Sequence, residues 1–315
     1  MKRSFRTVLI DAIDKNAKSD PKIVILNADS ARALKLTELS QKYPDRMYNM
    51  GISEADMLTT AAGMATTGLI PVVVGFSMFV SEKPFEQIRQ SIAYPNLNVK
   101  IIATHSGLCV GQDGATHQIL EDMAIMRILP NFKVFAAADV TETKSIIDAM
   151  IQYDGPAYLR LGRDLAEDIY FEEKKSVPGG ADVLLEGKDV TILACGLMVE
   201  QALIAAEHLK QEGILASVIN VYSIKPLNEK ILLEYAGKTG AIVTAEDHMI
   251  TGGLGGAVAE VLSSNCPVPI KMVGVKDCFG ESGTQDELYG KYGLTAENII
   301  QEVKKALALK MERVR

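Results

Sequence analysis

The chain has 315 residues, of which 48% are hydrophobic and 23% are charged, and its formal net charge at pH 7 is −7. This length suits two domains rather than one, and the acidic balance disfavours nucleic acid and acidic lipid as partners. The four cysteines lie far apart without a CxxC pair, which argues against a disulfide framework or a zinc finger. We therefore expect a cytoplasmic globular protein that binds neither nucleic acid nor membrane.

Short apolar strands alternate with helices through the first half of the chain. The strands are expected at residues 22–29, 71–79, 99–104, 133–139 and 157–161, and the helices at residues 7–17, 54–67, 84–93 and 141–151. This alternation predicts a parallel sheet covered on both faces. The uncharged window 57–81 contains four threonines, three glycines and Pro71, so it predicts a buried helix and strand instead of a membrane span.

The alternation lapses between residues 171 and 188, a polar stretch in which Gly179 and Gly180 follow Pro178. It resumes with strands expected at residues 190–194, 216–222, 241–245 and 270–275, and with helices at residues 199–211, 229–235, 253–262 and 296–309. The predicted fold class is α/β, with two doubly wound domains. They are expected at residues 1–170 and 189–315, the second being smaller, with the linker at residues 171–188.

The most informative stretch is the polar, glycine-rich loop that follows the strand expected at residues 99–104. Such a loop at the end of a buried strand is where α/β proteins usually place ligand chemistry. Four side chains suited to metal binding or proton transfer recur in it at intervals of four residues: His105, Cys109, Asp113 and His117. The glycines between them disfavour a helix, so this spacing is weak support for a metal site. A surface loop with incidental histidines is the alternative.

Three further patterns have both a structural and a chemical interpretation. The glycines at residues 252–256 suggest a dinucleotide site, but the G-x-G-x-x-G spacing fails at Val258, which favours close strand-to-helix packing. The segment Glu246-Asp247-His248 is either an acid–base group or, more commonly, a charged strand end. Glu54 follows Ser53, a candidate N-cap, and by itself is best explained as complementing the helix dipole.

In combination, these elements resemble the thiamine-diphosphate-dependent transketolase family, and the resemblance extends over essentially the whole chain. The segments that carry it are Gly51–Met57, Gly75–Phe79, Ala103–His117, Leu159–Arg163 and Thr251–Gly256. The first four are similar to the family's pyrimidine-binding domain, and the fifth to its C-terminal domain. The resemblance implies the C-terminal subunit of a split transketolase. Such an enzyme transfers a two-carbon ketol unit from a ketose phosphate to an aldose phosphate through a dihydroxyethyl-thiamine-diphosphate intermediate.

The resemblance also assigns the residues around the cofactor. Glu54 would hydrogen-bond the N1′ atom of the aminopyrimidine ring and so be catalytic, and a buried setting suits a carboxyl group that shares a proton with a ring nitrogen. Phe76 and Phe79 would form the aromatic wall around the pyrimidine. The family's third aromatic position falls on Glu82, and Phe85 is the expected substitute.

On the substrate side, the resemblance makes His117 a second catalytic residue, in contact with the donor's C1 hydroxyl or carbonyl oxygen. Asp113 would bind a sugar hydroxyl, and His105 and Arg163 the terminal phosphate, for which the forked donors of arginine are suited. A family arginine and serine near the start of this domain have only near matches, in Lys2, Arg3 and Ser30.

No segment of the sequence resembles the Gly-Asp-Gly…Asn metal motif of the family's diphosphate-binding domain, so no metal ligands are expected in this chain. The resemblance therefore implies a partner, the N-terminal transketolase subunit, in an α2β2 assembly. That subunit would hold Mg²⁺ or Ca²⁺, and the two chains would share the thiamine diphosphate site. The pentose phosphate pathway is the default setting, and a specialised ketose or sulfosugar pathway would use the same core residues.

Three alternatives share the fold. 1-Deoxy-xylulose-5-phosphate synthase has a similar Gly-x-Asp-Gly-x-Thr-His loop, but generally carries an aspartate where His105 stands. The beta subunit of a 2-oxo acid dehydrogenase has a similar length and lacks the Asp-Gly-x-Thr-His segment. A non-catalytic partner subunit is the third alternative, and the combination of Glu54, Asp113 and His117 argues against it.

Overall fold

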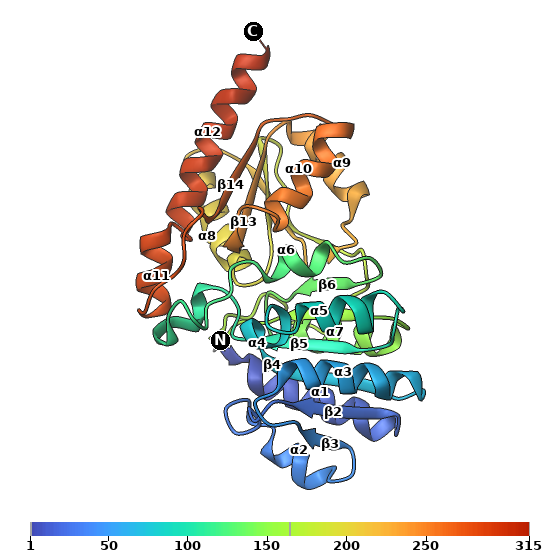
Figure 1. Cartoon of the computed structure of the whole chain (residues 1–315). Helices are drawn as coiled ribbons and strands as arrows, with labels where there is room; N and C mark the ends of the chain where they lie inside the picture. Colours follow the sequence, from blue (N-terminus) through green and yellow to red (C-terminus); the bar gives the residue numbers. More distant parts are fainter. Residues whose placement is uncertain (1, 164, 315) are drawn as a thin grey trace.

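Two sheets stand one above the other in the computed structural model, which describes residues 2–163 and 165–314 (Figure 1). Each sheet has helices packed against it, as the alternation of apolar strands and helices predicts. A separate pair of short strands, β1 (Arg3–Ser4) and β8 (Leu165–Ala166), joins the start of the chain to the end of its first half. The predicted α/β class with mainly parallel sheets is confirmed.

The N-terminal sheet has seven strands in the order β12-β6-β7-β5-β4-β2-β3. Each neighbouring pair is parallel except β12 with β6. Its strands are β2 (Ile23–Asn27), β3 (Met47–Asn49), β4 (Ile70–Phe76), β5 (Lys100–Thr104), β6 (Lys133–Ala136), β7 (Ala157–Arg160) and β12 (Ser223–Lys225). Every residue of β2 and β5 is buried, as expected for strands covered on both faces.

Helical segments of very different lengths precede or connect the strands of this sheet. They are α1 (Phe5–Ser19), α2 (Thr37–Lys42), α3 (Glu54–Thr66), α4 (Ser77–Ser81), α5 (Phe85–Gln87), the π-helical η1 (Ile88–Ala93), the 3-10 helical η2 (Leu108–Asp113), α6 (Asp122–Arg127) and α7 (Val140–Gln152). The uncharged window 57–81 forms most of α3 and β4. Its strand is mostly buried, as expected, whereas α3 buries one face and exposes Thr59, Gly63 and Thr66. Within the described residues, no helix has the length and apolar character needed to span a membrane.

Several expected strands end earlier in the structure than in the prediction, and one of these differences shapes the site. The strand expected at residues 71–79 ends at Phe76, and α4 begins at Ser77. A Cβ on Gly75 would lie 2.3 Å from Val80 Cγ1, so the glycine lets the chain turn back tightly over the strand end. The turn brings Phe76 and Phe79 to the same edge of the sheet.

The C-terminal sheet has five strands in the order β14-β13-β10-β11-β9, and only β9 is antiparallel to its neighbour. The strands are β9 (Asp182–Leu185), β10 (Val190–Ala194), β11 (Ala216–Asn220), β13 (Ile242–Met249) and β14 (Ile270–Val275). The helices are α8 (Met198–Gln211), α9 (Glu229–Thr239), α10 (Leu254–Asn265), α11 (Gln285–Tyr292) and α12 (Ala296–Val314).

Three edge strands of the two sheets lie where the sequence did not predict strands, among them β3 at one edge of the N-terminal sheet. β9 falls within the expected linker and pairs with β11, although none of its residues is fully buried. β12 lies in the second half of the chain but pairs with β6 of the N-terminal sheet. Short edge strands bury few side chains, so they leave little hydrophobic pattern in the sequence.

The glycines at residues 252–256 allow close packing at the start of α10. A Cβ on Gly253 would lie 2.0 Å from Glu246 Oε2, and one on Gly255 would lie 2.8 Å from Met272 Sδ. The Glu246 carboxylate accepts hydrogen bonds from the amides of Leu254 and Gly255, at 2.7 and 2.8 Å, and so caps the helix. The packing interpretation of this motif is therefore confirmed.

Candidate active site

Glu54 is the first residue of α3, and only 4% of its surface is exposed. Ser53 occupies the N-cap position, but its side chain makes no capping hydrogen bond. The Glu54 carboxylate instead pairs with Lys83, whose Nζ lies 2.5 Å from Oε2. A buried carboxylate with a single, half-exposed lysine partner differs from an ordinary helix-capping residue, and its placement suits proton chemistry.

A cavity of about 250 Å³ opens beside Glu54. Phe76 and Phe79 form one wall of it, with ring centroids 6.3 Å apart. Phe85, which the sequence analysis expects at the cavity, is not among the described residues that line it and packs against the hydrophobic core instead. Lys83 lines the cavity there. A buried carboxylate facing two aromatic rings fits a flat, nitrogen-containing ring that donates a hydrogen bond and stacks.

The two loop histidines stand against these phenylalanines. The His105 and Phe76 rings lie 4.2 Å apart, and the His117 and Phe79 rings meet edge-on at 5.2 Å. His105 has a φ of +58°, an unusual conformation for a residue with a side chain. Such backbone strain persists only where the surrounding structure imposes it, and it clusters at functional sites.

Burial, together with the nearby guanidinium groups of Arg163 and Arg6, lowers the pKa of His105 to about 4. The imidazole is therefore neutral at pH 7, and its Nδ1 lies 2.9 Å from Thr104 Oγ1 in a hydrogen bond. A neutral imidazole beside two arginines can donate one hydrogen bond to an anion, while the arginines supply the positive charge.

The loop itself, residues 105–118, is called the substrate loop below, after the role that the sequence resemblance implies for it. Its Asp113 is exposed and pairs with Arg163, whose Nη1 lies 3.1 Å from Oδ2. Arg163 also donates a hydrogen bond to the carbonyl oxygen of Val110, so it supports the loop as well as facing the site. Glu54, Phe76, His105 and Arg163 all follow the carboxyl ends of parallel strands, where open α/β sheets bind ligands.

Arg6 and Lys83 lie at this site, although the sequence analysis assigned neither. Arg6 is in the first turn of α1, and its Nη1 donates a hydrogen bond at 3.3 Å to the carbonyl oxygen of Ala33, which lines the cavity. Of the near matches considered for phosphate binding, Ser30 lines the cavity, whereas Arg3 pairs with Asp168 at 2.5 Å. Only proximity in the fold identifies Arg6, because a single arginine in an amphipathic helix leaves no motif.

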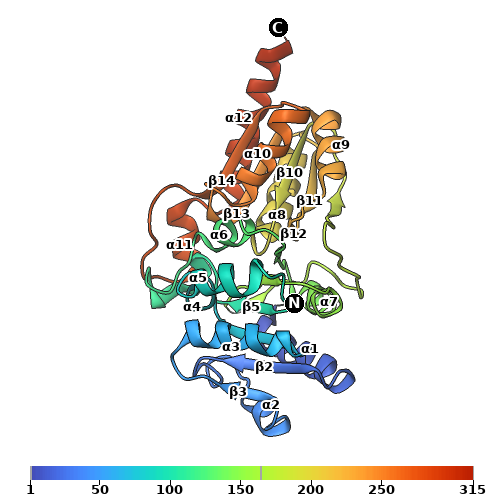
Figure 2. The same cartoon turned by 45° about the vertical axis from the view of Figure 1, so that its right-hand side comes forward.

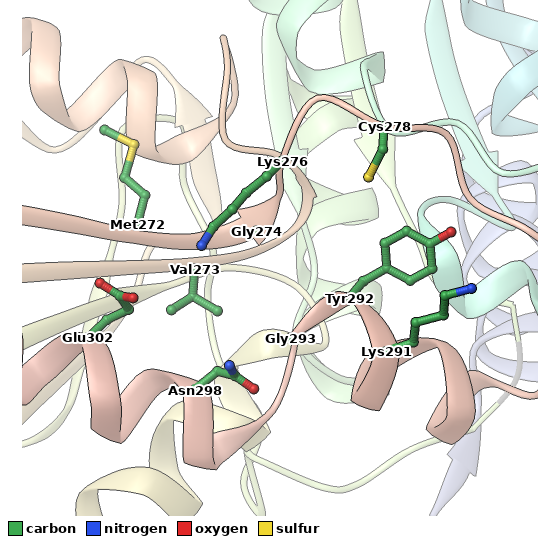
Figure 3. Close-up of a pocket in the computed structure, with 10 residues that line it drawn as sticks. All are labelled: Met272, Val273, Gly274, Lys276, Cys278, Lys291, Tyr292, Gly293, Asn298 and Glu302. Atoms are coloured by element: carbon green, nitrogen blue, oxygen red, sulfur yellow. The ribbon is translucent and has the colours of Figure 1, made fainter.

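No group of three or more His, Cys, Asp or Glu side chains with the geometry of a metal site occurs among residues 2–163 and 165–314. A second hollow, of about 420 Å³, lies in the C-terminal half between β14, α11 and α12 (Figure 3). Its charged lining is mixed: Lys276 extends towards the side of Glu302, whereas Lys291 points away from Glu302 and is paired with Glu281. This balance gives the hollow no preference for an anionic ligand.

Comparisons with known proteins agree with this arrangement. The chain is 43% identical to the 6-deoxy-6-sulfo-D-fructose transketolase subunit SqwH of Clostridium sp. (strain MSTE9), over 94% of this chain and 92% of that protein. It is 36% identical to the 1-deoxy-D-xylulose-5-phosphate synthase of Desulfotalea psychrophila (strain LSv54 / DSM 12343), over 94% of this chain but 47% of that protein.

A solved structure described as a split gene transketolase, an inactive beta4 tetramer, has the same fold. It matches with a TM-score of 0.92 and 46% identity, over 98% of this chain and 99% of that chain. The family model of the transketolase pyrimidine-binding domain matches residues 1–168, and that of the transketolase C-terminal domain matches residues 179–299. The chain therefore belongs to the transketolase family and has the two-domain layout of its split C-terminal subunits.

Proposed function

We propose that the chain is the C-terminal subunit of a two-chain transketolase, which transfers a two-carbon ketol unit from a ketose to an aldose. The observation that carries this proposal is the single cavity in which the buried carboxylate of Glu54 faces Phe76 and Phe79. The substrate loop adjoins that cavity through His105 and His117. This arrangement supports adjacent binding of cofactor and sugar in one site.

Glu54 is proposed to accept a hydrogen bond from N1′ of the aminopyrimidine and to hold the proton at that position. Bound thiamine diphosphate would supply the nucleophilic carbon and the electron sink. Phe76 and Phe79 would stack on the pyrimidine and exclude water from it. Lys83 must release the Glu54 carboxylate before the ring can take its place, and its half-exposed side chain can swing into solvent.

The substrate end of the site favours a ketose with an anionic group at the far end of its carbon chain. Arg163, Arg6 and the neutral His105 together offer forked donors and positive charge to a tetrahedral oxyanion. A phosphate ester and a sulfonate both meet this requirement, and the relative SqwH is named for a sulfonated fructose. His117 and Asp113 are proposed to bind the C1 oxygen and a hydroxyl group of the sugar.

The assembly is proposed to be an α2β2 complex with the N-terminal transketolase subunit, located in the cytoplasm. That subunit would bind the diphosphate of the cofactor through Mg²⁺ or Ca²⁺, while this chain contributes the pyrimidine and sugar contacts. Activity would then require both chains. The ketose donor that the complex accepts would decide between the pentose phosphate pathway and a sulfosugar pathway.

The test is to mix the chain with its candidate diphosphate-binding subunit, Mg²⁺ and thiamine diphosphate, and to follow ketol transfer to isotopically labelled glyceraldehyde 3-phosphate. The label is needed because xylulose 5-phosphate itself releases unlabelled glyceraldehyde 3-phosphate. Xylulose 5-phosphate and 6-deoxy-6-sulfofructose are the two donors, and the Glu54→Gln chain is the control. Transfer from either donor that Glu54→Gln abolishes supports the proposal. Condensation of pyruvate with the aldehyde would point to a synthase instead, and inactivity with both ketoses and with pyruvate would contradict an enzymatic role.

A further inference from the structure

The substrate loop depends on its surroundings for its shape. Gly107, Gly111 and Gly114 have φ values of +78°, +76° and +78°, which glycine adopts without steric cost. Between them, η2 is a short 3-10 segment with a kink at Gly111, and such segments have weak internal hydrogen bonding. A loop of this kind holds side chains in fixed places only if other elements fix it.

The C-terminal sheet supplies that support through Asp247 of β13, which is 3% exposed. Its carboxylate accepts hydrogen bonds from the amides of Leu108 and Cys109, at 2.9 and 3.3 Å, and from the hydroxyl of Tyr289 in α11, at 2.9 Å. These are the first amides of η2, which have no partners within the helix. A Cβ on Gly107 would lie 2.3 Å from Asp247 Oδ2, so the glycine admits the carboxylate.

A second contact holds the far end of the loop. The buried side chain of Gln118 donates hydrogen bonds to the carbonyl oxygens of Gly111 and Glu281, both at 3.0 Å. Glu281 belongs to the segment before α11, and a Cβ on Gly280 would lie 2.0 Å from Gln118 Oε1. Figures 1 and 2 show α11 beside the loop, where the two elements are in contact.

A buried ion pair continues the connection towards the cavity. Arg160 of β7 donates from Nη2 to the carbonyl oxygen of Asp247 at 2.6 Å, and from Nε to the Asp122 carboxylate at 3.0 Å. Asp122 in turn accepts a hydrogen bond from the hydroxyl of Ser77, which lies between Phe76 and Phe79 in the chain. The substrate loop and the aromatic wall therefore share one buried polar network.

We propose that Asp247 is a positioning residue, through which the C-terminal domain fixes the substrate loop in the conformation that binds the ketose. Asp247 acts through the amides of η2 and does not itself touch the sugar. The functional part of this inference rests on the proposed transketolase activity. The structural part does not, and it can be tested in the chain alone.

The first experiment measures amide hydrogen exchange in the full chain and compares Asp247→Asn with Glu246→Gln. Asparagine keeps the size of the side chain but replaces one acceptor oxygen by a donor, so the amides of η2 lose an acceptor. Glu246 is the matched control, because it is equally buried on the same strand but caps α10 within its own domain. We expect Asp247→Asn to speed exchange in residues 105–118 at least about tenfold. Glu246→Gln should affect only the start of α10.

The second experiment measures kinetics in the complex with the diphosphate-binding subunit. Asp247→Asn should lower kcat/KM for the ketose by about 10²-fold, the scale of an ångström-sized misplacement. It should change exchange of the cofactor's C2 proton less than about threefold, because Glu54 lies outside the loop. Tyr289→Phe, which removes one of the three donors and keeps the ring, should have the same pattern with a smaller effect.

Unchanged exchange in the substrate loop would overturn the inference. So would faster exchange in the loop with a kcat/KM equal to that of Glu246→Gln, since the contact would then have no effect on the donor. Loss of C2 proton exchange in parallel with donor turnover would also overturn it, because that marks general damage. If the wild-type complex transfers no ketol unit, the proposed function fails, and the hydrogen-exchange comparison still decides whether Asp247 fixes the loop.

Discussion

The aromatic wall of the cavity and the substrate loop are built in different ways. Glu54, Phe76 and Phe79 come from α3, β4 and α4, which pack on one sheet and lie close together in the chain. The substrate loop leaves the same sheet, but its conformation is set by Asp247 and the segment before α11 in the other half of the molecule. The proposed cofactor end is therefore local in sequence, whereas the proposed substrate end depends on contacts between the domains.

Glu54→Gln tests the cofactor end and has the largest expected effect. It should slow C2 proton exchange of the bound cofactor by about 10²–10⁴-fold, the usual worth of a positioned acid or base. Assembly with the partner subunit should be unchanged, because glutamine preserves the shape of the side chain.

The control for Glu54 is Asp56→Asn in the same first turn of α3. Asp56 interacts equally with the helix dipole but is exposed and does not line the cavity. Equal slowing by both variants would show that Glu54 serves only the helix, and the cavity would lose its proposed role.

Arg163→Ala tests the substrate end. It should raise KM for phosphorylated or sulfonated donors by about 10–100-fold, the equivalent of one hydrogen bond to a charged group. An uncharged ketose should be affected much less. Arg3→Ala is the control, since Arg3 pairs with Asp168 away from the cavity. Equal effects on charged and uncharged donors would mean that Arg163 supports the loop without binding the anion.

His105→Gln tests whether the loop is packed against the aromatic wall in solution. Burial lowers the pKa of His105 to about 4, so between pH 6.5 and pH 4 the unfolded chain binds a proton that the folded chain does not. Wild type therefore loses stability relative to the variant as pH falls through this range, on the order of 1 kcal/mol by pH 5.5.

Denaturant unfolding of both chains at pH 7.5 and pH 5.5 measures this difference. Replacement of His208, which is exposed on α8, is the control. A difference between His105→Gln and wild type that stays constant with pH would place His105 in water, and the stacking on Phe76 would not persist.

Lys83→Met has the smallest expected effect. In the proposed site Lys83 would compete with the aminopyrimidine for the Glu54 carboxylate, so its removal should tighten cofactor binding by the complex. The lysine is half exposed, and an ion pair of this kind contributes about 1 kcal/mol or less, so the gain should stay below about fivefold. Calorimetric titration with thiamine diphosphate measures it, and Lys15→Met, at a surface pair with Asp148, is the control. Weaker binding in Lys83→Met would make the lysine a ligand of the cofactor instead of a competitor.

The sequence predicts the repeated elements of the fold well, because buried parallel strands are continuous apolar runs. The strands expected at residues 190–194 and 270–275 have the observed bounds. It does not predict the edge strands β9 and β12 or the turn at Ser77, which depend on neighbours far along the chain. The apolar pattern around Ser77 predicts that the strand continues, but the chain turns back over Gly75 and the strand ends at Phe76.

The candidate site divides in the same way. The resemblance identifies Glu54, Phe76, Phe79 and the histidines, which the structure brings together, but it offered Phe85 where Lys83 lines the cavity. No sequence motif links Arg6 or Asp247 to the loop, because both lie about a hundred residues or more away from it in the chain. The sequence favours a charged strand end at residues 246–248. Only the hydrogen bonds from the amides of η2 to Asp247 reveal a connection to the site.

The central claim is that this chain supplies half of a shared active site, and a titration tests it most directly. Increasing amounts of the chain are added to a fixed amount of the diphosphate-binding subunit with thiamine diphosphate and Mg²⁺, and ketol transfer is measured. The claim predicts no activity from either chain alone and a plateau at equal amounts of the two. It also predicts that Glu54→Gln chain competes with wild type and lowers that plateau. Full activity from one chain alone, or from the complex with Glu54→Gln, would contradict it.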